Sequence, residues 1–260
     1  MKSLIKYFAN SKLGIVLRNS FKILPINIKT YDNNKTVSTV SDVFLWRTDN
    51  GFKTKFKFSD ILNLFYGVED SWVELHFYTK DNQLLKIQKI ESLNHVNEID
   101  ITAEYLGNIN DFGSFYIFHY CTKKSENLID NNILSNRCYI GYSKNNNLYS
   151  FVHGNAHAKF TSVYNNESIK SDIIRTSLFK NSEYTIQKYF DGFDKNELFF
   201  TNPTSKNIKF TIDNKNFELK PNFSLLVEIK SSIISIKSNC LFFRPTIFSY
   251  KGKYLDVHHS

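Results

Sequence analysis

The feature that most constrains the fold is a two-residue alternation that begins near residue 42 and continues almost to the end of the chain. In residues 52–58, three phenylalanines and a threonine alternate with three lysines. Because successive side chains of a β-strand point to opposite faces, this pattern predicts a strand with one buried face and one solvated face. Residues 72–78 alternate likewise, and a turn at 80–82 joins them to 84–90, which predicts a β-hairpin.

Further segments of this kind predict two β-rich blocks. Residues 99–106 and 113–120 complete a first sandwich domain at 41–125, and 126–180 supply connecting strands and the candidate site. In the second sandwich domain, 181–260, turns recur about every 8 to 12 residues, as in all-β folds. Its predicted strands span 184–190, 208–212, 217–219, 224–229, 233–236, 241–243, 246–250 and 254–257. The predicted fold class is mostly β, with two antiparallel β-sandwich-like domains and a short N-terminal basic helix.

The basic helix is placed within residues 1–30. Residues 1–28 carry five basic side chains and no acidic one, and the helix is expected to end before Pro25. A basic helix with apolar residues could lie on an anionic membrane as a peripheral contact. The alternative is a helix that packs on the domain behind it, with 31–41 as a polar linker.

Composition limits the classes of partner and compartment. The formal charge is +8, but only five of the 33 basic residues are arginine. Arginine predominates in bidentate contacts to nucleic acids, whereas scattered lysine is typical of a solvated surface, so a nucleic-acid partner is not favoured. The three cysteines lack metal-binding spacing, and neither a signal peptide nor a membrane-spanning segment is predicted. We expect a cytoplasmic protein that is peripheral to the membrane if the basic helix binds it.

Candidate site residues gather in residues 113–155. His119 is in phase with Phe115 and Ile117, which predicts that its side chain points into a core or a cleft wall. Arg137 opens a strand next to a turn, where its guanidinium could clamp a carboxylate, a phosphate or an acidic sugar. It could equally pair with Glu126 or Asp130 and only hold the loop.

Aromatic and amide side chains in the same segment are typical of sugar-binding sites. Pyranose rings stack on aromatic side chains while short polar groups bind the hydroxyls. Tyr142 and Asn155 are therefore added as ligand-binding candidates. The tyrosines and asparagines that carry this pattern are Tyr116, Tyr120, Tyr139, Tyr142, Tyr149, Asn145, Asn146, Asn147 and Asn155.

Histidines near the end of this segment are candidates for metal ligands and for a general base. His153 and His157 lie four residues apart on extended chain, about 13 Å, so one metal would require a sharp bend at Gly154. We predict no metal and no cofactor, and the sequence lacks dinucleotide-binding, P-loop and nucleophile-elbow motifs. As a catalytic candidate, His153 could act as a general base near neutral pH.

Five short motifs remain, at residues 41–47, 111–120, 137–142, 149–155 and 244–259. They resemble those of a bacterial family associated with gene clusters for surface polysaccharide (capsule or O-antigen) assembly. The resemblance implies a biological setting and no particular reaction. His157 and the terminal His259 are not part of the family pattern.

Together these observations predict a carbohydrate-recognising protein that acts in bacterial surface polysaccharide assembly, with a glycan or sugar-containing ligand bound between the two blocks. One alternative is a glycan-modifying enzyme that uses His153 as general base and Arg137 to position an anionic group. A second alternative is a structural or interaction protein without a small ligand.

Overall fold

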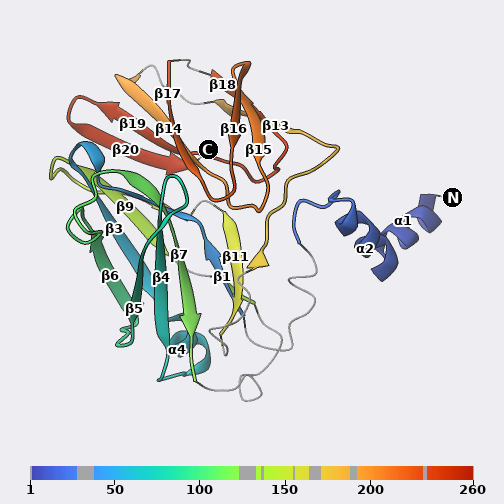
Figure 1. The fold of residues 1–260 in the computed structure, drawn as a ribbon, viewed down its shortest axis with the longest axis horizontal. Helices are drawn as coiled ribbons and strands as arrows, with labels where there is room; N and C mark the ends of the chain where they lie inside the picture. Colours follow the sequence, from blue (N-terminus) through green and yellow to red (C-terminus); the bar gives the residue numbers. More distant parts are fainter. Residues whose placement is uncertain are drawn as a thin grey trace.

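The computed structural model describes residues 2–27, 38–122, 133–135, 138–154, 156–163, 171–187, 192–230 and 233–259. The predicted fold class is confirmed, because these residues form several antiparallel sheets preceded by short N-terminal helices (Figure 1). The predicted hairpin is also confirmed, since β4 pairs antiparallel with β5. Two predicted site residues, Arg137 and Asn155, lie outside the described residues.

The N-terminal half of the β-structure contains three four-stranded sheets. Sheet I has the order β2 (Phe44–Arg47), β7 (Phe112–Tyr120), β4 (Trp72–Thr79) and β5 (Leu84–Ile90). Sheet II has the order β10 (Ser150–His153), β9 (Tyr139–Lys144), β3 (Phe52–Ser59) and β6 (Val96–Ile101). Sheet III has the order β12 (Ser171–Asp172), β11 (His157–Ser162), β1 (Ser38–Asp42) and β8 (Ile133–Ser135). A 3-10 turn, η1 (Asp49–Gly51), precedes β3, and a short helix, α4 (Ile61–Tyr66), follows it.

Sheets I and II face each other across an aromatic core. The ring of Phe56 on β3 lies 4.8 Å from Phe44 and 4.9 Å from Phe115, both on sheet I. Along β3, the phenylalanines and Thr54 are buried and the lysines are turned outward, as the alternation predicted. The predicted strand at 99–106 was wrong in extent, because β6 ends at Ile101 and the chain then turns.

The C-terminal half contains two sheets. Sheet IV has the order β17 (Ser224–Ile229), β14 (Lys195–Thr201), β19 (Thr246–Lys251) and β20 (Tyr254–His259). Sheet V has the order β13 (Ser182–Gln187), β18 (Ile233–Ser238), β15 (Ile208–Ile212) and β16 (Lys215–Leu219). The rings of Phe200 on sheet IV and Phe210 on sheet V lie 5.0 Å apart in the shared core. The predicted strand at 241–243 was wrong, because these residues form a turn in which Phe243 N donates to the Cys240 carbonyl.

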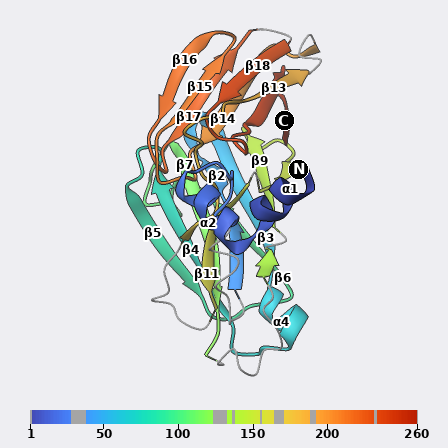
Figure 2. The ribbon, with the colours of Figure 1, turned by 90° about the vertical axis from the view of Figure 1, so that its right-hand side faces the viewer.

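Sheet IV joins the two halves because both of its faces are buried. Leu198 and Phe200 of β14 point into the C-terminal core, whereas Phe199 between them belongs to the core of sheets I and II. Its ring lies 5.1 Å from that of Phe112. Figures 1 and 2 show the orange and red C-terminal half packed on one end of the N-terminal half.

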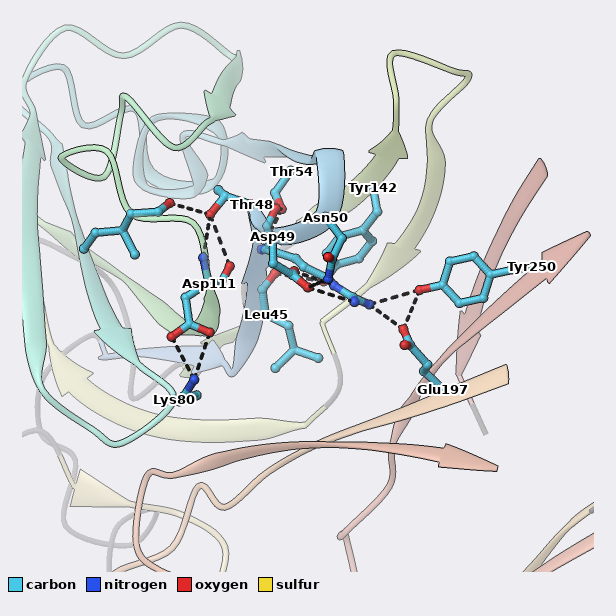
Figure 3. Close-up of polar contacts among 12 residues, drawn as sticks. Leu45, Thr48, Asp49, Asn50, Thr54, Lys80, Asp111, Tyr142, Glu197 and Tyr250 are labelled. Carbon is cyan, nitrogen blue, oxygen red and sulfur yellow. Dashed lines mark hydrogen bonds and ion pairs between the residues drawn. The ribbon is translucent and has the colours of Figure 1, made fainter. Parts of the chain in front are cut away.

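A buried arginine spans the same junction. Arg47, at the end of β2, is 2% exposed. Its guanidinium donates to Asp49 at 2.7 Å on its own side, and to Glu197 at 2.7 Å and the Tyr250 hydroxyl at 3.1 Å on sheet IV. Figure 3 shows this network between Asp49 and the Glu197–Tyr250 pair. Because both carboxylates are largely buried, the arginine offsets the cost of removing their charges from water.

The N-terminal segment is helical as predicted, but it forms two short helices where one was predicted. They are α1 (Lys2–Asn10) and α2 (Lys12–Ser20), and Ser11 between them caps α2 by accepting a hydrogen bond from Gly14 N at 3.1 Å. In Figure 1 both helices stand beside the β-structure. At the end of α2, the Arg175 guanidinium donates a hydrogen bond to the Asn19 carbonyl at 2.8 Å. No helix in the described part of the chain is long and apolar enough to cross a bilayer.

Candidate functional site

The predicted site residues that the structure describes do not converge on one hollow. His119 on β7 is 0% exposed and is in phase with two core residues. Of the two predicted positions, a core or a cleft wall, it therefore occupies the core. Tyr142 on β9 is also buried, where its hydroxyl donates to the Leu45 carbonyl at 2.8 Å and its ring packs edge-on against Phe248. A ligand cannot reach either side chain, because both are buried, so neither is a binding residue.

His153 lies elsewhere, exposed on the last residue of β10. Its ring contacts that of Tyr139, with centroids 4.4 Å apart. His157 opens β11 in a different sheet and pairs with Asp42, so the two histidines that might have shared a metal have separate partners. His259 lies near His153; burial lowers its pKa, and the charge of His153 lowers it further. In the described ranges, no group of three or more His, Cys, Asp or Glu side chains could hold a metal ion.

The outer face of sheet II carries the arrangement that best fits a binding site. The register of its four strands aligns outward-facing side chains in two rows that run across the sheet. Each row passes from an acid on β6 through a lysine on β3 to an aromatic or imidazole ring on β10. The rows are Glu98, Lys57, Tyr139 and His153, and Asp100, Lys55, Gly141 and Phe151.

Four rings gather at the β9–β10 edge of this face, and we call Tyr139, Tyr149, Phe151 and His153 the aromatic platform. Tyr139 is 48% and Phe151 40% exposed. The rings of Tyr149 and Phe151 are 5.9 Å apart and inclined by 32°. The platform therefore offers aromatic surface to solvent in pairs of neighbouring rings.

Gly141 makes room for one of these rings. A β-carbon at Gly141 would lie 2.5 Å from Cε1 of Phe151, which is closer than non-bonded atoms approach in proteins. The residue sits in regular strand pairing between Lys55 and Phe151, so the need for glycine comes from the ring that covers it. The sequence therefore builds this flat surface with a glycine and a phenylalanine that face each other across two strands.

The charged ends of the rows are paired with one another. Lys57 contacts Glu98 at 3.0 Å, and Lys55 contacts both Glu98 and Asp100. Hydrogen bonds from Lys55 and Lys57 lower the pKa of Glu98, which keeps the carboxylate ionised. Lys57 also lies 5.0 Å above the ring of Phe151, and Lys55 lies 5.4 Å from that of Tyr149. Donors and acceptors of hydrogen bonds thus border the aromatic surface.

Sequence reasoning found part of this surface and missed the rest. Tyr139, Tyr149 and His153 were among the singled-out residues, but Phe151 and Gly141 were not. Phe151 is in phase with His153, so the same alternation could have identified it as outward-facing. The pairing of β9 with β3, which brings the lysines beside the rings, carries no local signal in the sequence.

Compared with known proteins, the sequence matches no protein family and no curated protein.

Proposed function

We propose that the protein recognises a carbohydrate, which it holds on the outer face of sheet II. The observation that carries this proposal is the aromatic platform, whose rings lie on the outer face of the sheet and are bordered by paired charged side chains. A sugar ring has an apolar face that stacks on such rings and hydroxyl groups that exchange hydrogen bonds with lysines and carboxylates.

The charge pattern argues against a nucleic acid as the ligand of this face. Aromatic rings and lysines together can bind single-stranded nucleic acid. Here, however, the two lysines in the rows are neutralised by Glu98 and Asp100. The carboxylates would repel a phosphate backbone, whereas a sugar hydroxyl can donate to them.

The proposed setting is bacterial surface polysaccharide assembly, which rests on the resemblance described above. Two of the motifs that carry it, residues 137–142 and 149–155, contain the whole aromatic platform and Gly141. The enzyme alternative keeps His153 as general base and Arg137 as the group that positions an anion. His153 is exposed and contacts the ring of Tyr139, whereas His157 pairs with the Asp42 carboxylate.

A glycan array followed by affinity electrophoresis tests the proposal. We expect the wild-type protein to retain glycans of bacterial surface polysaccharides, and Phe151→Ala and Tyr139→Ala each to weaken binding about 10-fold, or about 1.4 kcal/mol. Phe179→Ala is the matched control, because this ring is 75% exposed but lies outside sheet II, and it should leave affinity within about twofold. If no glycan is retained, or if Phe151→Ala binds as the wild type does, the platform is not a carbohydrate site and the interaction-protein alternative gains support.

We also propose an anionic membrane surface as the partner of α1 and α2. Ile5, Phe8 and Leu13 are each more than half exposed, so these three apolar side chains are not buried against the domain. Residues 1–28 combine these side chains with five basic residues and no acid, the combination that binds anionic lipid headgroups.

Vesicle flotation tests this partner. Vesicles containing phosphatidylglycerol should carry the protein and pure phosphatidylcholine vesicles should not. Replacing Lys6 and Lys12 together by glutamine should weaken binding roughly 10- to 30-fold, at about 1 kcal/mol per lysine. Lys251→Gln, distant on β19, is the control. Equal flotation with both lipids would show that the basic residues have no such role.

A further inference from the structure

A cavity of about 310 Å³ opens beside the aromatic platform, where the two halves of the molecule meet. Asp42, Gly154 and His157 line it from the N-terminal half, and Phe242 and Arg244 come from the turn before β19. Gly154 directly follows His153, the last residue of the platform. Ile173 and Ile174 add an apolar wall. The cavity lies at the small end of the size range of ligand pockets, which suits one sugar residue.

A β-bulge creates the central ion pair of the cavity. In the β1–β11 ladder, Ser41 is opposite Lys159, but the next residue, Asp42, is opposite His157. The skipped residue, Ala158, is buried. This shift brings Nδ1 of His157 to 2.8 Å from the Asp42 carboxylate. Bulges of this kind often turn side chains towards functional sites.

Position 154 requires glycine, because the chain passes close to the Asp42–His157 pair there. A β-carbon there would lie 2.3 Å from the Asp42 carboxylate oxygen Oδ2. Any other residue would push the carboxylate away from His157. The sequence around the cavity is thus arranged to keep Asp42 and His157 in contact, and the imidazole side chain, 54% exposed, remains open to a ligand.

The charges that line the cavity favour an anion. The hydrogen bond to Asp42 raises the pKa of His157, so the imidazole tends towards its cationic form, and the carboxylate is already engaged with it. Arg244 adds a permanent positive charge and can bind an oxyanion through two parallel hydrogen bonds. With the Asp42 carboxylate counted against the protonated His157, Arg244 leaves the lining with a net charge of +1, which beside an apolar wall matches a ring that bears one acidic group.

We propose that this cavity is an anion-binding subsite for an acidic sugar residue, one that carries a carboxylate or a phosphate, in the glycan held on the platform. The glycan identity rests on the proposed function, whereas the preference for an oxyanion rests on His157 and Arg244 alone. The sequence suggests that Arg137 binds an anionic group. In this proposal Arg244 has that role, and the imidazole of His157 binds the same group.

Isothermal titration of the full chain with monosaccharides tests this subsite separately from the platform. Glucuronate and glucose 6-phosphate should bind at least 10-fold more tightly than glucose, and comparison of the two identifies the preferred oxyanion. Arg244→Gln and His157→Gln should each weaken acidic-sugar binding at least 10-fold. Arg244 is exposed, so this variant should fold even if His157→Gln does not. Lys251→Gln, which removes one exposed charge elsewhere, should change affinity by less than twofold.

The two sites fail in different ways. Phe151→Ala should reduce retention of a long glycan but leave the affinity for glucuronate unchanged, and Arg244→Gln should leave retention of a neutral glycan unchanged. Glucose binding as tightly as both acidic sugars would overturn the subsite, as would acidic-sugar binding that survives both cavity variants. Loss of glycan retention with intact glucuronate binding would overturn the platform alone.

Discussion

Replacing Glu197 by glutamine should lower the free energy of unfolding by about 3 kcal/mol at neutral pH. Burial alone would raise the pKa of Glu197, but the charge of Arg47 and hydrogen bonds from Lys195, Tyr250 and Arg47 outweigh it and lower the pKa from 4.5 to about 2. Each tenfold change in proton affinity corresponds to about 1.4 kcal/mol. The Glu197 side chain is 7% exposed, so solvent screens the interaction little.

The pH dependence follows from the direction of this pKa change. Because the pKa of Glu197 is lower in the folded than in the unfolded state, its stabilisation is complete above about pH 5 and is lost as the pH falls towards about 2. At pH 3.5 the wild-type protein should have lost about 1.4 kcal/mol of this contribution. The Glu197→Gln variant lacks this contribution at every pH. The difference in free energy of unfolding between the two proteins should therefore narrow from about 3 to about 2 kcal/mol.

Urea unfolding at pH 7, 5 and 3.5, followed by tryptophan fluorescence, measures both effects. Glu183→Gln is the control, since it removes the same charge from an exposed carboxylate that lies 3.5 Å from Lys237. That surface pair should contribute no more than about 0.5 kcal/mol. If Glu197→Gln destabilises the protein no more than Glu183→Gln, or if its effect is the same at pH 7 and pH 3.5, Arg47 and Glu197 do not hold the halves together as argued.

Three further substitutions test the packing. Gly141→Val should displace the Phe151 ring and reduce glycan retention as much as Phe151→Ala does, with little change in melting temperature; a variant that binds normally would contradict the role of this glycine. Tyr142→Phe removes the hydrogen bond to the Leu45 carbonyl and should cost about 1 kcal/mol, seen as a melting temperature lower by about 2–4 °C. Phe199→Ala should cost about 3–5 kcal/mol in urea unfolding. A loss below about 1 kcal/mol would mean that sheet IV contributes little to the first core.

Local periodicity explains which elements could be predicted from the sequence. In β3, one face is buried and the other is turned towards solvent, so alternation predicts each side chain's direction. In β4, the alternation likewise identifies Val73, Leu75 and Phe77 as buried. β14 was not predicted, because both of its faces are buried and Leu198, Phe199 and Phe200 form a continuous apolar run. The break between α1 and α2 depends on one capping serine, Ser11, which the pattern of basic and apolar residues does not reveal.

The sequence by itself determined that the chain forms antiparallel β-structure, that the lysines of β3 face water and that basic helices precede it. Only the tertiary structure decided which distant residues meet. Arg47 contacts Glu197 across 150 positions, Asp42 meets His157 through a bulge, and the platform forms where β9 and β10 join β3. Strand direction follows from neighbouring residues, whereas strand partners follow from the packing of whole faces, for which a single sequence contains no local signal.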